Sequence, residues 1–214
     1  MTALSDKDFR LASNGADFVF PDGVPLVWML RLLGAGQAER VYGPDVMLAI
    51  CELGTTNEHS HFFYGGNVGV PELLIEKLIT RFPGIKIAGC HSPPFKPLSL
   101  SEDAEVVDKI NRSGAQFLWV GLGAPNQEKW MAKHLGRIKV PVMLGVGAAF
   151  DFHAGTIRQA SRCMQKAGLE WLFRLFMEPR RLWKRYLYNN PRFVYHAGKE
   201  VMLHHGKNLK KGSK

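Results

Sequence analysis

The stretch FLWVGLGAPNQEKW, at residues 117–130, decides the fold class of this 214-residue chain. Four apolar residues precede a turn that has glycine at 121 and 123, and Pro125 opens a polar run that favours a helix. A buried strand that passes through a glycine turn into a helix is typical of a parallel sheet covered by helices. Amides at such a helix start, with the helix dipole, form a site for anions such as a nucleotide diphosphate. A plain tight turn is an equally good interpretation, because the stretch is neither GxGxxG nor a P-loop.

The same alternation extends outward over residues 17–155. We predict strands at 17–23, 61–66, 85–91, 117–123 and 140–152, and helices at 24–33, 44–55, 69–82, 101–111 and 125–138. This order predicts a Rossmann-like α/β fold, with a parallel sheet and helices on both faces. Ligands bind outside the carboxyl ends of such strands. We therefore expect binding residues at Asp22–Gly23, Gly65–Gly66, Gly121–Gly123 and Gly145–Asp151.

The chain changes character after about residue 155. Residues 1–157 hold 14 Lys and Arg against 16 Asp and Glu, whereas residues 158–214 hold 14 against 3, a balance of +11. Apolar residues follow helical spacing from 171 to 187, and Pro179 should divide this run into two helices. We therefore divide the chain into a Rossmann-like domain, 1–157, and a basic, amphipathic helical appendage, 158–214.

Such a charge asymmetry marks a segment that meets phosphate. Aromatic residues lie among the cations of the appendage, which leaves three interpretations: a helix pair that packs on the core, a nucleic-acid surface and a membrane-interface element.

The sequence argues against several classes of protein. The longest apolar run, 140–150, is roughly half of the ~20 residues that span a bilayer, and the N-terminus has no apolar core of a secretory signal. Cys51, Cys90 and Cys163 are far apart and include no CxxC pair, which argues against a disulfide framework and a zinc site. We expect a cytoplasmic protein without a membrane-spanning helix.

Asp22 is the first candidate for catalysis. It follows the apolar residues 18–20, so a strand ending there would hold its carboxylate at the rim of the sheet, where a general base is needed. The alternative is that Asp22 is an Asp-Gly turn residue, or the N-cap of the helix that begins at Val24.

Other polar residues have weaker signals. Gln127 is placed to reach a sugar or a base, although it also fits an ordinary surface glutamine. Asp151 and His153 make only half of a metal site; the alternative is close helix packing, with Asp151 as a cap or hydrogen-bond anchor. We expect His59 and His61 to lie in an exposed loop.

Seven blocks in order, which span residues 16–191, resemble one family. They are ADFVFPDGVPLVWMLRLLG, RVYGPD, FFYGGN, RFPGIKIAG, VGLGAPNQEKW, GVGAAFDFHAG and GLEWLFRLFMEPRRLWKRYL. Together they are similar to the WecG/TagA/CpsF glycosyltransferases, glycosyltransferase family 26.

This resemblance implies an inverting, metal-independent glycosyltransferase that has no cofactor. The implied donor is a UDP-sugar of N-acetylmannosamine, a uronic acid or a related hexose, and the implied acceptor is a polyprenyl-diphosphate-linked glycan. The implied role is in bacterial cell-surface polysaccharide or teichoic acid biosynthesis. The protein would lie in the cytoplasm as a peripheral protein, bound to the anionic surface on the inner face of the cytoplasmic membrane. No nucleic acid is expected as a partner. The alternative is a catalytically impaired protein of the same fold that binds a UDP-nucleotide or anionic lipid.

The resemblance also assigns roles to single residues. Asp22 matches the family's general base, and Arg40 and Gln127 match positions at the substrate pocket. Leaving-group stabilisation and membrane contact fall to three cations of the appendage: Arg174, Arg181 and Lys184. Substrate contacts are also expected at the sheet edge, at Gly65, Gly66, Gly121, Gly123 and Asp151. Family members usually carry further residues before this start, with a strand that ends in Thr-x-Asn and lines the donor pocket, and SNGAD at 13–17 does not supply that pattern.

Overall fold

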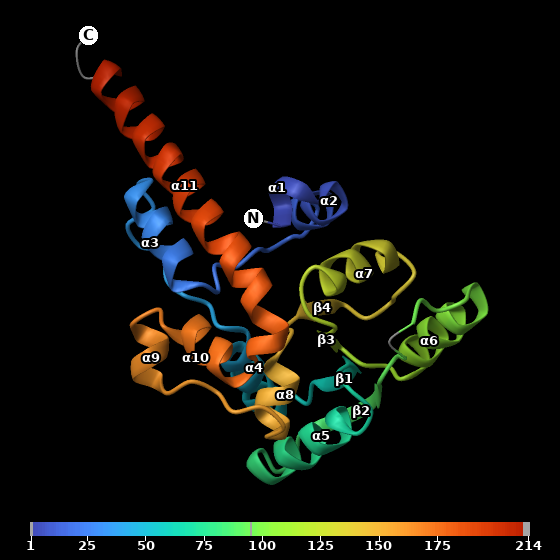
Figure 1. Cartoon of the computed structure of the whole chain (residues 1–214). Helices are drawn as coiled ribbons and strands as arrows, with labels where there is room; N and C mark the ends of the chain where they lie inside the picture. The colour runs from blue at the N-terminus through green and yellow to red at the C-terminus, as the bar shows by residue number, and fades with distance from the viewer. Residues whose placement is uncertain (1, 95, 212–214) are drawn as a thin grey trace.

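A four-stranded parallel sheet forms the centre of the molecule (Figure 1). The computed structural model describes residues 2–94 and 96–211. The strands are β1 (Ser60–Gly65), β2 (Lys86–His91), β3 (Phe117–Gly121) and β4 (Val142–Gly145), in the order β2-β1-β3-β4. This sheet confirms the predicted Rossmann-like α/β architecture.

Helices cover both faces of the sheet. The first face packs against α4 (Gly43–Thr56), α5 (Val70–Arg81) and α8 (Ala149–Ala154), and the second against α6 (Leu100–Arg112) and α7 (Asn126–His134). Side chains alternate across a strand, so Phe63 of β1 joins the first core while Phe62 and Tyr64 join the second. Each face therefore has its own apolar core.

The carboxyl ends of β1 and β3 lie so close together that only glycine, which has no side chain, fits at the last residue of each strand. Gly65 lies opposite Gly121 in the register, and a Cβ on Gly65 would be 2.6 Å from the carbonyl carbon of Gly121. Gly65 also has a φ of +124°, a region that favours glycine. On Gly121, a Cβ would lie 2.8 Å from the ring of Phe150, so α8 packs directly against this strand end.

Buried polar pairs stabilise both faces. On the first face, Trp119 Nε1 donates to His61 Nδ1 at 3.2 Å, and burial lowers the pKa of His61 to about 4. His61 is fully buried in β1, so the predicted exposed loop is wrong for this residue. On the second face, the Asp103 carboxylate of α6 lies 2.8 Å from His134 Nε2 of α7 and 2.7 Å from Arg137 Nη1.

Two predicted strands are wrong in whole or in part. Residues 17–23 are extended chain outside the sheet, and Phe18 and Phe20 are 78% and 54% exposed. The predicted strand at 140–152 ends at Gly145, because residues 149–154 form α8 instead. Both errors have one cause: a short apolar run does not distinguish a strand from a buried helix or from an exposed apolar segment.

The N-terminal residues form two helices that were not predicted, α1 (Thr2–Ser5) and α2 (Lys7–Asn14). Asp6 caps α2 by accepting from Phe9 N, and its carboxylate pairs with Lys129 Nζ of α7 at 2.6 Å. The chain then runs to α3 (Val24–Leu32). The N-terminal helix pair therefore packs on the helix that follows the glycine turn of 121–123.

Three helices follow the sheet: α9 (Arg162–Lys166), α10 (Glu170–Met177) and α11 (Pro179–Lys211). Pro179 begins α11, which confirms the predicted division of the amphipathic run into two helices. α11 begins beside α10, passes α3 and extends away from the sheet (Figure 1). Across the described residues, no helix combines the length and apolar character that crossing a membrane requires.

Candidate active site

Asp22 lies directly before α3, in a segment held by Arg40. The N-cap of α3 is Gly23, so Asp22 neither ends a strand nor caps the helix. Arg40 Nη2 lies 3.3 Å from Asp22 Oδ1, and Arg40 Nε donates to the backbone carbonyl of Asp22. The side chain of Asp22 remains 62% exposed. Arg40 therefore holds the backbone of Asp22, while the Asp22 carboxylate stays open to solvent.

A second carboxylate, that of Glu170, holds the same arginine from the opposite direction. Glu170 is the first residue of α10, and its Oε2 lies 2.6 Å from Arg40 Nη2. Its Oε1 accepts from the Tyr42 hydroxyl at 2.9 Å, and that hydroxyl accepts from Gln159 Nε2 at 3.0 Å. The Arg40 guanidinium also stacks over the Tyr42 ring, 4.0 Å from its centroid. We call Asp22, Arg40, Tyr42, Gln159 and Glu170 the base network.

The charges of the base network shift the pKa of its members. Although the Asp22 side chain is largely exposed, partial desolvation by the surrounding protein raises its pKa, Arg40 lowers it and the negative charge of Glu170 raises it, so that the pKa lies above the usual value. Burial disfavours the charged form of Arg40, but its pairing with Glu170 outweighs this and raises its pKa. Burial also raises the pKa of Tyr42, so its hydroxyl stays a donor to Glu170.

Arg174 lies one turn beyond Glu170 on α10 and adds a positive charge near Asp22. Its guanidinium sits over the Phe152 ring of α8, 5.8 Å from the centroid, and it lowers the pKa of Asp22 by coulombic attraction. Arg174 Nε is buried without a hydrogen-bond partner within the described structure. Nη2 of the same side chain lies 3.9 Å from Glu178 Oε2, so Nε is the donor that could recognise an anionic group.

The base network lies at the carboxyl end of the sheet. A Cβ on Gly43 would lie 3.4 Å from the carbonyl oxygen of Val146, which follows β4. α8 connects the two regions, because Phe150 packs on Gly66 and Gly121 while Phe152 lies under Arg174. The structure thus brings Asp22, Arg40 and Arg174 to the edge where the sheet loops end.

Gln127 is buried against these loops rather than open to solvent. Its Oε1 accepts from Gly123 N at 3.1 Å, and its Nε2 donates to Glu128 Oε1 at 3.0 Å. A Cβ on Gly145 would lie 2.9 Å from Gln127 Nε2. Gln127 therefore fixes the shape of the glycine turn and its distance from β4.

Asp151 and His153 each have a partner within the protein. Asp151 Oδ1 accepts from Thr156 Oγ1 at 3.1 Å, and His153 Nε2 lies 2.9 Å from the carbonyl oxygen of Pro44. No group of three or more His, Cys, Asp or Glu side chains suited to a metal occurs in residues 2–94 and 96–211 as far as they are described. Asp151 has the geometry of a hydrogen-bond anchor.

The other predicted cations lie on the first turns of α11. Arg181 Nη2 pairs with Glu178 Oε2 at 2.7 Å, and Lys184 Nζ lies 5.6 Å from the centroid of the Trp183 ring. Both side chains are on the exposed surface of the helix. Their contacts within the described structure are with Glu178 and Trp183 rather than with members of the base network.

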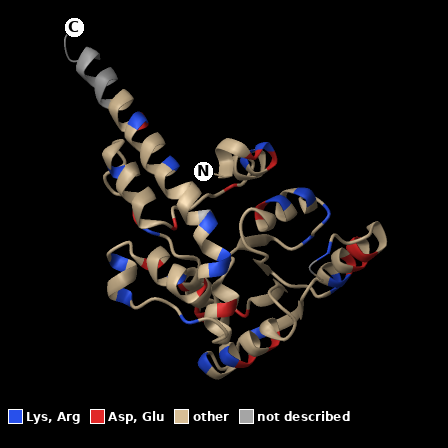
Figure 2. Ribbon diagram, viewed as in Figure 1, with Lys and Arg blue, Asp and Glu red and all other residues tan. Residues whose placement is uncertain are grey.

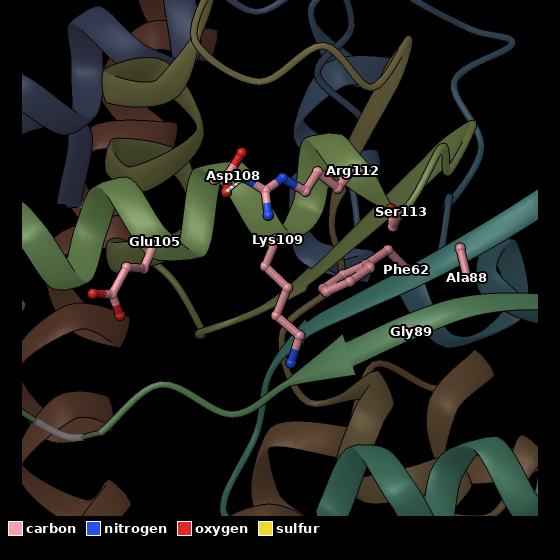
Figure 3. Close-up of a pocket in the computed structure, with 8 residues that line it drawn as sticks. All are labelled: Phe62, Ala88, Gly89, Glu105, Asp108, Lys109, Arg112 and Ser113. Carbon is pink, nitrogen blue, oxygen red and sulfur yellow. Dashed lines mark ion pairs between the residues drawn. The ribbon is translucent and has the colours of Figure 1, made fainter.

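A cavity of 490 Å³ lies elsewhere, between α6 and β2 (Figure 3). Lys109 crosses it and donates to the carbonyl oxygen of Cys90 at 3.0 Å, and Arg112 pairs with Asp108 at 2.8 Å. The cavity is lined by Phe62, Ala88, Gly89, Glu105, Asp108, Lys109, Arg112 and Ser113. None of the predicted site residues lines it.

The model of the glycosyl transferase WecG/TagA/CpsF family matches residues 1–207. The chain belongs to this family. Curated relatives agree with that assignment. An N-acetylglucosaminyldiphosphoundecaprenol N-acetyl-beta-D-mannosaminyltransferase of Bacillus spizizenii (strain ATCC 23059 / NRRL B-14472 / W23) is 31% identical over 192 residues, which cover 90% of this chain and 72% of the relative. Proteins of the same name from Bacillus subtilis (strain 168) and Staphylococcus aureus (strain MW2) are each 30% identical, over 86% and 87% of this chain and 70% of each relative.

As a member of the WecG/TagA/CpsF family, the chain is a glycosyltransferase. The sequence prediction missed three residues of its base network: Tyr42, Gln159 and Glu170. One signal was available, because Glu170 is one of only three acidic residues in the basic segment 158–214. An isolated acid among cations suggests a specific ion pair, here the one with Arg40.

Proposed function

We propose that this chain transfers a sugar from a UDP-sugar, with inversion, to a polyprenyl-diphosphate-linked glycan in the synthesis of a bacterial cell-surface polymer. The names of the relatives favour N-acetylmannosamine as the sugar and an N-acetylglucosaminyl-diphosphoundecaprenol as the acceptor. The observation that supports the proposal most is the base network, which pairs the exposed carboxylate of Asp22 with Arg40 at the carboxyl end of the sheet.

In the proposed reaction Asp22 is the general base. Its carboxylate takes the proton from the acceptor hydroxyl while that oxygen attacks the anomeric carbon of the donor from the face opposite UDP. The bond between the anomeric carbon and the UDP oxygen breaks, and UDP leaves with the bonding electrons. The raised pKa of Asp22 favours this role, because a stronger base accepts the proton more readily.

Stabilisation of the departing diphosphate is the second requirement. We propose Arg174 for this role, since its Nε has no hydrogen-bond partner in the described protein and its charge acts on Asp22, whereas Arg40 is already paired with Glu170. We propose that Arg181 and Lys184 add positive charge at the membrane side, and that amides of the glycine turn at Gly121–Gly123 hold the donor diphosphate. Gly65, Gly66, Gln127 and Asp151 would shape the donor pocket around that turn.

Residues 158–214 are proposed to attach the enzyme to an anionic membrane at its cytoplasmic face. Figure 2 shows Lys and Arg spaced along α11. Large apolar side chains are exposed on α10 and α11 as well, at Trp171, Phe176, Trp183, Leu187, Tyr188, Val194 and Tyr195. Cations together with aromatic side chains suit the headgroup region of a bilayer.

The proposed function is tested by measuring UDP release from a panel of UDP-sugars, with a polyprenyl-diphosphate-linked N-acetylglucosamine as acceptor, with and without EDTA. We expect turnover with UDP-N-acetylmannosamine that resists EDTA and yields an inverted linkage. Binding of UDP without transfer from any donor would contradict the proposal and favour the nucleotide-binding alternative. Loss of turnover in EDTA would contradict the metal-independent mechanism alone.

A further inference from the structure

We propose that Glu170 is a positioning residue that keeps the Asp22 carboxylate available as a base by drawing Arg40 toward itself. The inference rests on the proposed function, because it assumes that Asp22 is the base. It goes further by giving a role to a residue that enters the site from α10. Glu170 would act through Arg40 and would not itself contact the reacting atoms.

The distances show how the arginine is shared. Arg40 Nη2 is 2.6 Å from Glu170 Oε2 but 3.3 Å from Asp22 Oδ1, so the stronger of its two ion pairs is with Glu170. This pair is also the better shielded, since the side chains of Arg40 and Glu170 are 19% and 15% exposed. A guanidinium occupied by Glu170 leaves the exposed carboxylate of Asp22 only loosely paired.

Glu170 is itself held in a fixed position. Its second oxygen accepts from Tyr42, whose hydroxyl is held by Gln159 and whose ring supports the Arg40 guanidinium. Both carboxylate oxygens therefore have one partner each, and both partners belong to the segment before α4. This arrangement fixes the side chain more firmly than a single surface ion pair would.

The balance of charge around Asp22 gives this geometry a consequence for reactivity. The groups that face Asp22 are Arg40 from the segment before α4, and Arg174 and Glu170 from α10. Two of them are positive and one is negative. Without the negative charge of Glu170, the attraction of Arg40 and Arg174 would lower the pKa of Asp22, and a carboxylate with a lower pKa is a weaker base.

The position of Glu170 also couples the base to the docking of α10. The segment of α9 and α10 is held on the sheet domain by a bidentate ion pair of Arg162 with Asp45, at 2.7 and 2.9 Å. Glu170 reaches Arg40 only while α10 lies in this place. The base would therefore be set for reaction when the C-terminal helices are docked.

The test compares Glu170→Gln with wild type and with Glu200→Gln, a matched control that removes an exposed carboxylate of α11. The ¹³C chemical shift of the Asp22 carboxyl carbon, assigned with Asp22→Asn, is followed through a pH titration of the full chain. We expect Glu170→Gln to lower the pKa of Asp22 and Glu200→Gln to leave it unchanged. An unchanged Asp22 pKa in Glu170→Gln would overturn the inference, whether or not the protein transfers sugar.

Kinetics give a second measurement. In Glu170→Gln we expect kcat to fall about tenfold, the acid limb of the kcat profile to move to lower pH, and the Kd for UDP to stay within about twofold. Glu170→Asp keeps the charge, so the acid limb of its kcat profile should lie closer to the wild-type pH than that of Glu170→Gln. A lower Tm together with an unmoved limb would show a structural role only and refute the positioning role. Absence of transfer in wild type would instead contradict the proposed function, while the titration of Asp22 would still decide the inference.

Discussion

The sheet edge and the base network make up the two parts of the proposed site, and they are built by different means. At the sheet edge, Gly65 and Gly121 are fixed by backbone contact, and Gln127 is buried between two loops. In the base network, Asp22 and Arg40 lie on irregular segments, and ion pairs of Arg40 join Asp22 to Glu170 of α10. Packing holds the first part, whereas electrostatics hold the second. Substitutions in the first should therefore change stability, and substitutions in the second should change reactivity.

The largest effect is expected from Asp22→Asn. The change keeps the shape but removes the base, so kcat should fall by about 10²- to 10⁴-fold while Tm and UDP affinity hardly change. Transfer is measured as UDP release, and affinity by calorimetry. Asp17→Asn is the control, since Asp17 is an exposed acid in the same extended segment. A wild-type rate for Asp22→Asn would show that Asp22 is not the base. It would also contradict the expectation that substitutions in the base network change reactivity.

Asp103→Asn should have the next largest effect, on stability rather than on chemistry. Asp103 is buried against His134 but its partner Arg137 is 42% exposed, so we expect a loss of about 2 kcal/mol, below the cost of breaking a fully buried ion pair. Burial alone would raise the pKa of Asp103, but the hydrogen bonds from Arg137 and His134 outweigh it and lower the pKa. Its contribution to stability is therefore present above the unfolded value of 3.8 and is lost as pH falls through the folded pKa.

Denaturant unfolding between pH 3 and pH 7 checks the Asp103 prediction. Wild type should lose stability toward the acid end, and the pH dependence of Asp103→Asn should be weaker. Equal slopes for the two proteins would show that Asp103 does not carry the acid sensitivity of the sheet domain.

Gly65→Ala sharpens the comparison at the sheet edge. The new methyl group would overlap the backbone of Gly121, and the φ of +124° adds strain, so we expect a loss of about 2 kcal/mol and a Tm lower by about 4–8 °C. Gly36→Ala is the control, because a Cβ there meets no atom within 4 Å. Equal Tm values for the two variants would show that the strand ends can move apart.

The smallest effect is expected from Lys184→Gln. This exposed cation should contribute about 1 kcal/mol to binding of anionic vesicles, which is roughly a fivefold change in affinity, and nothing to stability. Sedimentation with vesicles of phosphatidylglycerol and phosphatidylcholine measures it. Lys77→Gln on α5 is the control away from α11. The difference between the two should shrink at high salt, because the charges are exposed.

The sequence predicts the sheet better than it predicts the site. β1 and β3 were placed correctly because each is an apolar run that ends in a glycine. The close contact of Gly65 with Gly121 requires glycine at both positions, so the signal has a structural cause. The helices α3 to α7 were placed within a few residues, since caps such as Ser99 and the prolines at helix starts are local signals, whereas α1, α2 and α8 were not predicted as helices. The segment 17–23 failed because its apolar residues have no partner strand in the described structure, and pairing is not written in a local pattern.

The base network could be predicted only in part. Asp22 and Arg40 came from the resemblance to the family, whereas the ion pair with Glu170 joins residues 130 positions apart. A contact of that separation depends on how α10 docks, and no motif encodes the docking. The composition of the C-terminal segment predicts contact with phosphate, but it does not identify the single acid, Glu170, that pairs with Arg40.

The length of α11 has a consequence for how far the enzyme reaches. At a rise of 1.5 Å per residue, its 33 residues measure about 50 Å, and its first turn begins directly after the helix that carries Glu170. Lying flat, such a rod would bring the reaction centre down to the level of the lipid phosphates. Standing upright on its C-terminal end, the helix would hold Asp22 about 50 Å from the membrane surface. This distance exceeds the thickness of a bilayer, so Asp22 could not reach a diphosphate anchored in the membrane. If α11 attaches the enzyme to a membrane as proposed, the angle of this helix to the surface would set the distance between Asp22 and the acceptor.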